Sequence, residues 1–179
     1  MAGRSEIAPD FHLLAESLPQ IVWVHQRDGT LEFANQRGLT YAGIKPQELA
    51  SRLRMARLLH PNDRRRLRDE WRAAQERGIG FSLEARLRRS DGIYHWHLIQ
   101  LHPMRDEHGA VTKWLGTGTD VHAVRESEER SAFLLALSTE LARIGEPHEL
   151  LCTAMGRLRE RLKAKQVSLA ELDHEAREL

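Results

Sequence analysis

Apolar and polar residues alternate in several short stretches between residues 21 and 121, and this alternation predicts β-strands. Two strands, at 21–25 and 31–34, are separated by Asp28-Gly29, a dipeptide typical of hairpin turns. Three more follow consecutively after residue 80, and the second of these is expected to end near Pro103. Because the helical stretches lie together between the two groups of strands, the pattern predicts an α+β domain with an antiparallel sheet.

Helical spacing of apolar residues marks the segments between and around these strands. A short helix is expected from Asp10 to Leu18, and a longer one is expected to run up to Gly78, with Asn62 or Asp63 as its N-cap. After the last strand the pattern is helical from 121 to 144. There, four apolar residues are spaced three, four and three apart, which is the seam of a two-helix contact. They are Leu134, Leu137, Leu141 and Ile144. A second helix through Cys152 and a strand at 166–173 complete the expected order.

Charge and composition exclude several classes of partner. Lys and Arg number 27 against 26 Asp and Glu, a balance that gives no electrostatic argument for nucleic acid or an anionic membrane. The basic run at 64–68 is interleaved with acidic residues and is interpreted as a solvated helix face. A single cysteine excludes an internal disulfide, and the absence of a long apolar stretch or signal peptide favours a cytoplasmic setting. We expect Cys152 to be a buried apolar residue of its helix.

Four stretches in the same order resemble a PAS domain. They are "ESLPQIVWVHQRDGTLEFAN", "LLHPNDR", "RLRRSDGIYHWHLIQLHPMRDEHGAV" and "WLGTGTDV". The second carries His-Pro-x-Asp-Arg, which is typical of a bacterial signalling subgroup of that family. The resemblance covers 10–124 and implies a five-stranded antiparallel sheet whose short helices enclose a small cavity, followed by a long helix.

The resemblance also implies a role for Asp120 and Val121. In PAS domains the last strand commonly ends in Asp, a β-branched residue and Thr, and passes directly into a signalling helix; here His122 replaces the Thr. Asp120 is a good N-cap residue, so a signal relay and a simple helix cap both remain open. Residues 1–9 are expected to be a leader and 125–145 the signalling helix. The segment 146–179 resembles the start of a GAF domain that continues beyond Leu179.

Ligand candidates lie on the strand around residue 97. His95, His97, Ile99 and Leu101 share one of its faces, and if this face lines the cavity, His97 could bind an anion or a metal. The ordinary alternative is a histidine hydrogen-bonded to the backbone. The reactive-cysteine motif of flavin-binding relatives is absent, and 64–77 lacks the histidine that haem-binding relatives place on this helix. We therefore expect no cofactor and no metal site.

No catalytic motif occurs, so the chain is not expected to be an enzyme. The preferred hypothesis is a sensory and dimerising input module of a signalling protein, either a sensor histidine kinase of a two-component system or a cyclic-dinucleotide enzyme. Its partners would be a second copy of the chain and a downstream output domain. Two alternatives remain open: a ligand-free dimerisation domain, and a haem or metal redox sensor that uses His95 and His97.

Overall fold

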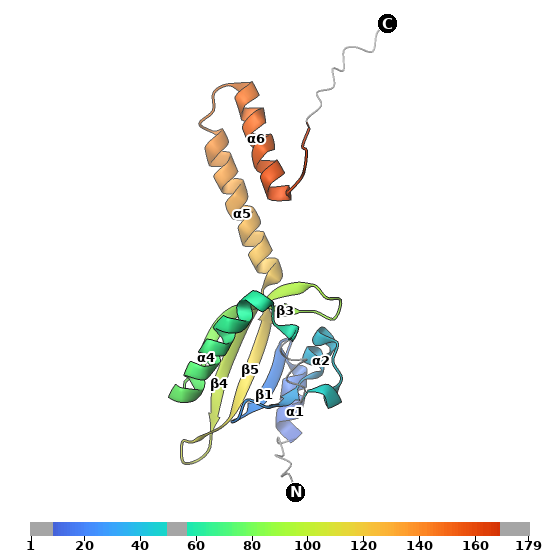
Figure 1. Ribbon diagram of the computed structural model, residues 1–179, viewed down its shortest axis with the longest axis vertical. Coiled ribbons are helices and arrows are strands. Elements are labelled where there is room, and N and C mark those ends of the chain that lie inside the picture. Colours follow the sequence, from blue (N-terminus) through green and yellow to red (C-terminus); the bar gives the residue numbers. More distant parts are fainter. Residues whose placement is uncertain (1–8, 50–56, 169–179) are drawn as a thin grey trace. The chain divides into compact units, whose positions relative to one another are not determined.

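In the computed structural model, residues 9–49 and 57–168 are described, and they divide into two units, 1–125 and 126–179. The first unit contains a five-stranded antiparallel sheet in the order β2-β1-β5-β4-β3, so the last strand lies at its centre (Figure 1). The strands are β1 (Ile21–Gln26), β2 (Leu31–Ala34), β3 (Phe81–Arg88), β4 (Tyr94–Arg105) and β5 (Val111–Asp120). The expected α+β fold is confirmed.

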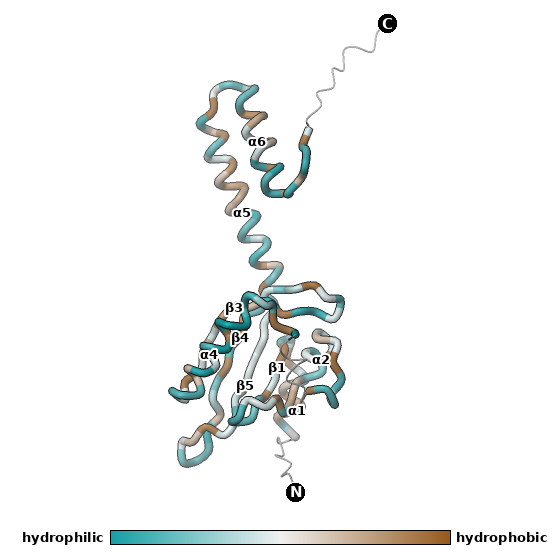
Figure 2. The backbone as a smooth tube through the Cα atoms, viewed as in Figure 1, coloured by the Kyte–Doolittle hydropathy of each residue, from teal (hydrophilic) through white to brown (hydrophobic). Residues whose placement is uncertain are grey.

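Helices cover both faces of this sheet. The α-helices of the first unit are α1 (Pro9–Ser17), α2 (Gln36–Ala42) and α4 (Arg64–Arg77), and two short 3-10 helices are η1 (Pro46–Glu48) and η2 (Pro61–Asp63). α4 is largely hydrophilic (Figure 2) but turns Leu67, Trp71 and Ala74 towards the sheet. On the opposite face α1 packs Ala15 against Val22 and Val24. The alternation of β1 therefore separates two cores, one on each side of the sheet.

A buried asparagine joins α1, β1, β2 and α2. Asn35 is fully buried, and its Oδ1 accepts hydrogen bonds from the backbone N–H of Val22 (3.1 Å) and of Gly38 (3.0 Å). Its Nδ2 donates to the carbonyl oxygens of Ala15 (3.0 Å) and Gln20 (2.9 Å). The side chain thus caps α2 and leaves no polar atom unsatisfied, as a buried amide requires.

The carboxylate of Asp63 does not cap α4, contrary to that part of the sequence prediction. It instead accepts from the backbone N–H of Arg86 (3.0 Å) and from its guanidinium Nε and Nη2 (2.9 Å each). The preceding turn is held by His60, whose Nδ1 accepts from the N–H of Asn62 (3.2 Å). Asp63 and Arg86 are 23 residues apart, so their spacing in the sequence does not show that the Asp63 carboxylate pairs with Arg86 and leaves the helix uncapped.

β4 continues through Pro103, where the sequence predicted its end. β3 begins at Phe81, opposite Leu101, whereas Pro103 pairs with Trp114 of β5. Among the described residues, β4 is paired with a strand on one side only at this position, and a strand edge tolerates the missing N–H of proline.

The second unit contains the rest of α5 (His122–Leu141) and α6 (Pro147–Leu162). Glu140 of α5 pairs with Arg157 of α6 (2.9 Å), and the Arg161 guanidinium lies 5.3 Å from the centroid of the Phe133 ring. The strand expected at 166–173 is not formed at 166–168, and its remainder lies outside the described residues. Residues 1–8 of the leader expected at 1–9 also lie outside them, and Pro9 is the first residue of α1.

Candidate functional site

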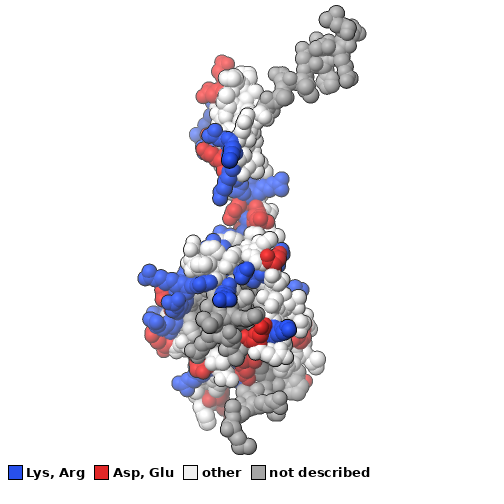
Figure 3. Space-filling view, turned by 45° about the vertical axis from the view of Figure 1, so that its right-hand side comes forward, with Lys and Arg blue, Asp and Glu red and all other residues white. Residues whose placement is uncertain are grey.

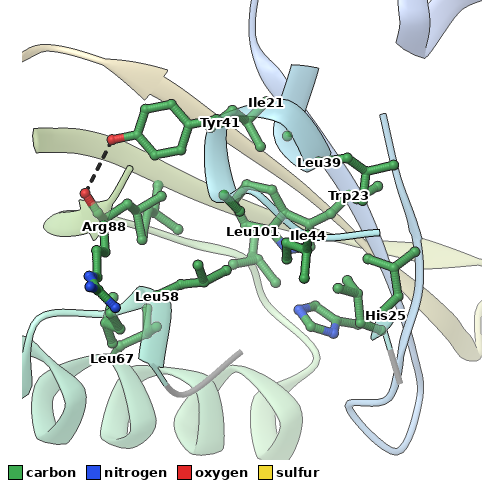
Figure 4. Close-up of a pocket in the computed structure, with 18 of the residues that line it drawn as sticks. Ile21, Trp23, His25, Leu39, Tyr41, Ile44, Leu58, Leu67, Arg88 and Leu101 are labelled. Carbon is green, nitrogen blue, oxygen red and sulfur yellow. Dashed lines mark hydrogen bonds between the residues drawn. The ribbon is translucent and has the colours of Figure 1, made fainter. Parts of the chain in front are cut away.

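A largely apolar cavity of about 290 Å³ lies between the sheet and the helices α2 and α4 (Figure 4). β1 and β4 form its floor through residues such as Ile21, Trp23 and Leu101, and α2 and α4 contribute Leu39 and Leu67. The full lining is Ile21, Trp23, His25, Gly29, Leu31, Ala34, Gly38, Leu39, Tyr41, Ala42, Ile44, Leu49, Leu58, Leu59, Leu67, Trp71, Phe81, Leu87, Arg88, Ile99 and Leu101. Pockets for small organic ligands are typically apolar with few polar groups, and this cavity has the same character.

Two glycines of β5 shape the floor of this cavity. Trp23 pairs with Gly116 across β1 and β5, and a Cβ at Gly116 would lie 2.1 Å from the Trp23 ring. A Cβ at Gly118 would lie 3.3 Å from the same ring. β5 is therefore pale in Figure 2, with neither strongly apolar nor strongly polar residues along much of its length. The absence of side chains lets the indole lie flat on the central strand and keeps the space above it open.

His25 is a polar residue of the cavity wall. Burial lowers its pKa from the ordinary 6.5 to about 4, although the nearby carbonyls of Gly29 and Thr30 oppose the shift. Its Nδ1 is buried and has no hydrogen-bond partner within the described ranges. The hydroxyl of Tyr41, in contrast, donates to the carbonyl oxygen of Leu87 (3.1 Å; dashed in Figure 4). Arg88 is exposed at the cavity's edge.

Ile99 and Leu101, both on the β4 face singled out from the sequence, line the cavity. His97 is on the same face but beyond the lining; it is buried, and burial lowers its pKa. Its ring packs against Tyr41 (4.8 Å between centroids), and its Nδ1 lies 3.1 Å from the carbonyl oxygen of His95. The face therefore divides into an apolar part within the cavity and a histidine part at the end of the sheet.

At that end β5 passes into α5 without a loop. The Oδ1 of Asp120 accepts from the backbone N–H of His122 (2.9 Å), and its Oδ2 lies 3.2 Å from Nδ1 of His95. The N–H of Val121 donates to the carbonyl oxygen of Trp96 (2.9 Å), so β4 holds the first residue of the junction. Desolvation raises the pKa of Asp120, but the bonds from His122 and His95 outweigh it and leave the pKa below its ordinary range.

A clamp missed by sequence reasoning fixes the first turn of α5 to the outer face of the sheet. Arg125 pairs with Glu84 of β3 (2.5 Å between Nη1 and Oε2), and its guanidinium lies 4.2 Å from the centroid of the Trp96 ring. Arg86 lies over the same ring at 4.9 Å. The participants come from β3, β4 and α5, and no spacing in the sequence relates them.

The four residues of the expected seam occupy different positions in the second unit. Leu134 is 53% exposed, whereas Leu137 lines a groove between α5 and α6. Leu141 is the last residue of α5, and Ile144 follows the helix, whose end is tightened by a bond from the Ile144 N–H to the Leu141 carbonyl (3.1 Å). The helix is therefore shorter than predicted.

Cys152 is exposed, contrary to the prediction of a buried residue. Its Sγ lies 3.7 Å from Nε2 of His148, one turn earlier on α6. The contacts of α6 described above use Arg157 and Arg161, further along the helix than Cys152.

Neither a metal cluster nor a membrane span is found where the structure is described. No group of three or more His, Cys, Asp or Glu side chains in 9–49 and 57–168 could hold a metal ion. Over the same ranges no helix has both the length and the apolar character needed to cross a bilayer. Basic and acidic side chains lie next to each other on the face shown in Figure 3, and Arg65 pairs with Asp69 on the exposed side of α4 (3.8 Å).

Comparison with known proteins identifies the first unit. Residues 31–118 match the family model described as the PAS fold, and this stretch contains β2 to β4 and most of the central strand β5. Residues 31–118 form a PAS domain. A related sequence is mak1 of Schizosaccharomyces pombe, named a peroxide stress-activated histidine kinase, with 35% identity over 135 residues. The alignment covers 73% of this chain, which spans only 8% of mak1.

Solved structures share the PAS fold at lower identity. The N-terminal domain of a diguanylate cyclase with a PAS/PAC sensor, from Marinobacter aquaeolei, has a TM-score of 0.53 at 21% identity, with 59% of this chain and 98% of that chain covered. A light-oxygen-voltage domain studied with a flavin analogue has a TM-score of 0.54 at 22% identity, with 68% and 96% covered. These likenesses show the fold alone.

Proposed function

We propose that this chain is a sensory and dimerising input module of a signalling protein. Its PAS domain would bind a small molecule in the cavity, and the change would reach an output domain through α5. The observation that carries this proposal is the direct passage from β5 to α5 at Asp120, which caps the helix while it ends the central strand. The relation to mak1 supports a histidine kinase as the output, and the diguanylate cyclase fold neighbour keeps a cyclic-dinucleotide enzyme as an alternative.

The position of β5 supports the relay. Its residues pair with β1 on one side and β4 on the other, and Trp23 lies on it from the cavity side. A ligand that moves Trp23 or Leu101 would therefore act on the strand that ends at the helix cap. On the other face, the Arg125 clamp couples the first turn of α5 to β3 and β4. A switch of α5 between two positions requires contacts that differ between those positions. The Asp120 cap and the Arg125 clamp would supply these contacts.

Alanine at Asp120 is expected to loosen the first turn of α5 while the sheet stays intact. Loss of an N-cap costs about 1 kcal/mol, which corresponds to roughly fivefold faster amide exchange in the affected turn. The measurement is hydrogen–deuterium exchange of peptides covering 121–126, compared with peptides from β4 and β5.

Asp106→Ala provides the matched control. The Oδ1 of Asp106 accepts from the N–H groups of His108 and Ala110 in the turn before β5, at 3.0 and 2.9 Å. This variant removes the same kind of bond at the other end of β5 and should leave 121–126 unchanged. Equal exchange of 121–126 in wild type and Asp120→Ala would contradict the relay.

The dimerisation part of the proposal places a helical seam at Leu134. Its exposed side chain lies on α5 beside Leu135, which is 69% exposed but occupies an outward position in the predicted repeat. Leu134→Glu is expected to convert the dimer into a monomer because it places a charge in the apolar seam, whereas Leu135→Glu should not. Light scattering coupled to size-exclusion chromatography measures the mass, and a Leu134→Glu protein that remains dimeric would refute the seam.

The cavity favours a ligand sensor over a ligand-free dimerisation domain. A domain whose only task is to hold two chains together gains stability from a filled core, because unfilled apolar space forfeits dispersion contacts. Space of about 290 Å³ lined by Trp23, Trp71 and aliphatic side chains is instead consistent with a bound molecule.

A further inference from the structure

We propose that the cavity binds an uncharged, mainly hydrophobic molecule that carries a single hydrogen-bonding oxygen, such as an alkylphenol, and that His25 contacts this oxygen. The inference rests on the proposed sensory function, because it names the class of ligand for the same cavity. It adds a specificity-determining residue, His25, that the comparisons do not indicate.

The lining of the cavity favours a ligand that is hydrophobic and uncharged. Aliphatic and aromatic side chains from the sheet, α2 and α4 surround the space, and the Tyr41 hydroxyl is already engaged by the Leu87 carbonyl. A carboxylate or ammonium group placed here would lose its hydration without a compensating partner. The nearest fixed charge of the lining, on Arg88, is exposed at the edge and so leaves the interior without a counter-ion.

The position of His25 favours a ligand that carries one polar group. Figure 4 shows its imidazole reaching into the cavity from β1, on the side of Ile44. The buried Nδ1 has no partner in the described part of the chain, and such an unsatisfied atom calls for a partner from elsewhere. Burial keeps the ring neutral near pH 7, with one N–H and one bare nitrogen. A hydroxyl oxygen can accept from or donate to a neutral imidazole, whereas a carboxylate is best held by a cationic one.

Three matched probes distinguish the ligand classes: 4-propylphenol, propylbenzene and 4-propylbenzoate. They share one apolar body and differ in a hydroxyl, a hydrogen and a carboxylate. Titration calorimetry on the full chain should detect binding of the phenol and the hydrocarbon, with the benzoate at least tenfold weaker than the phenol. If 4-propylbenzoate bound most tightly of the three, the proposal of an uncharged ligand would be overturned, and Arg88 would become the candidate partner of the carboxylate.

Variants of His25 test the hydrogen bond. His25→Leu is expected to weaken 4-propylphenol binding about tenfold, the equivalent of one hydrogen bond, while propylbenzene binding changes less than about threefold. His25→Gln, which keeps a polar group, should restore part of the phenol affinity even if the leucine variant folds poorly. His102→Leu, at an exposed position of β4 outside the lining, should bind all probes as wild type does.

Two further results would overturn the inference. Equal losses for phenol and hydrocarbon in His25→Leu would show that His25 shapes the cavity rather than binds oxygen. Failure of all three probes to bind wild type would refute the ligand class. The relay experiment at Asp120 requires no ligand, so its outcome remains informative about the proposed function in either case.

Discussion

Replacement of Asp63 by alanine is expected to lower the free energy of unfolding of the PAS domain by about 3 kcal/mol. The side chain of Asp63 is 9% exposed and accepts three hydrogen bonds from Arg86, two of them from the guanidinium. Breaking a buried ion pair costs about 3–5 kcal/mol because one charge is left without its partner. The side chain of Arg86 is 27% exposed and regains some hydration, so the lower end of that range applies. Urea denaturation followed by tryptophan fluorescence measures the change.

The matched control is Asp69→Ala. Asp69 pairs with Arg65 on the exposed side of α4, and such surface pairs contribute about 0.3–0.5 kcal/mol. The hydrogen bonds from Arg86 hold the pKa of Asp63 below its ordinary range. Its contribution is therefore complete above about pH 4 and disappears as the pH falls through the lowered pKa. Equal stability of the Asp63→Ala and Asp69→Ala proteins at neutral pH would contradict the central role of this pair.

Acid should destabilise the wild-type domain more than a His25→Leu variant. Burial lowers the pKa of His25 from 6.5 to about 4, so the unfolded chain binds a proton in a range where the folded chain does not. The stability contribution is complete above pH 6.5 and is lost progressively as the pH falls towards 4. At 1.36 kcal/mol per pKa unit, the difference between wild type and variant should change by about 3 kcal/mol over this range.

Denaturant titrations at several pH values between 4 and 7.5 measure this difference. Comparison with His25→Leu cancels the titration of other histidines, and His102→Leu should show the acid sensitivity of wild type. A parallel loss of stability in wild type and His25→Leu would mean that the imidazole titrates normally, which would also weaken its assignment as a neutral ligand contact.

The fold was largely readable from the sequence because local signals agree with it. Gly29 adopts a positive φ angle of 85° in the turn that the dipeptide Asp28-Gly29 predicts. Gly78 ends α4 in a left-handed conformation, as its position after the apolar repeat indicates. The structure differs from these predictions where a distant partner decides: Asp63 pairs with Arg86 in place of capping, and Pro103 is tolerated because β3 begins only at Phe81, opposite Leu101.

The candidate site was readable only in part. Alternation along β4 placed Ile99 and Leu101 on one face, but it could not divide that face between the cavity and the end of the sheet. His25 shares a strand face with Ile21 and Trp23, so the alternation along β1 places it on the cavity side. The Arg125 clamp had no such signal, because Glu84, Trp96 and Arg125 meet only after the sheet has formed.

The hydrogen bonds of Asn35 have a consequence for the order in which the domain folds. All four partners of its side chain lie between residues 15 and 38, so closing this network costs little chain entropy. Pairing of β1 with β5, for example Val22 with Thr117, instead joins segments from opposite ends of the domain. The N-terminal hairpin can therefore assemble with α1 and α2 as a local nucleus. Pairing of β5 with β1 would follow, and it would complete the cavity and attach α5 in one step.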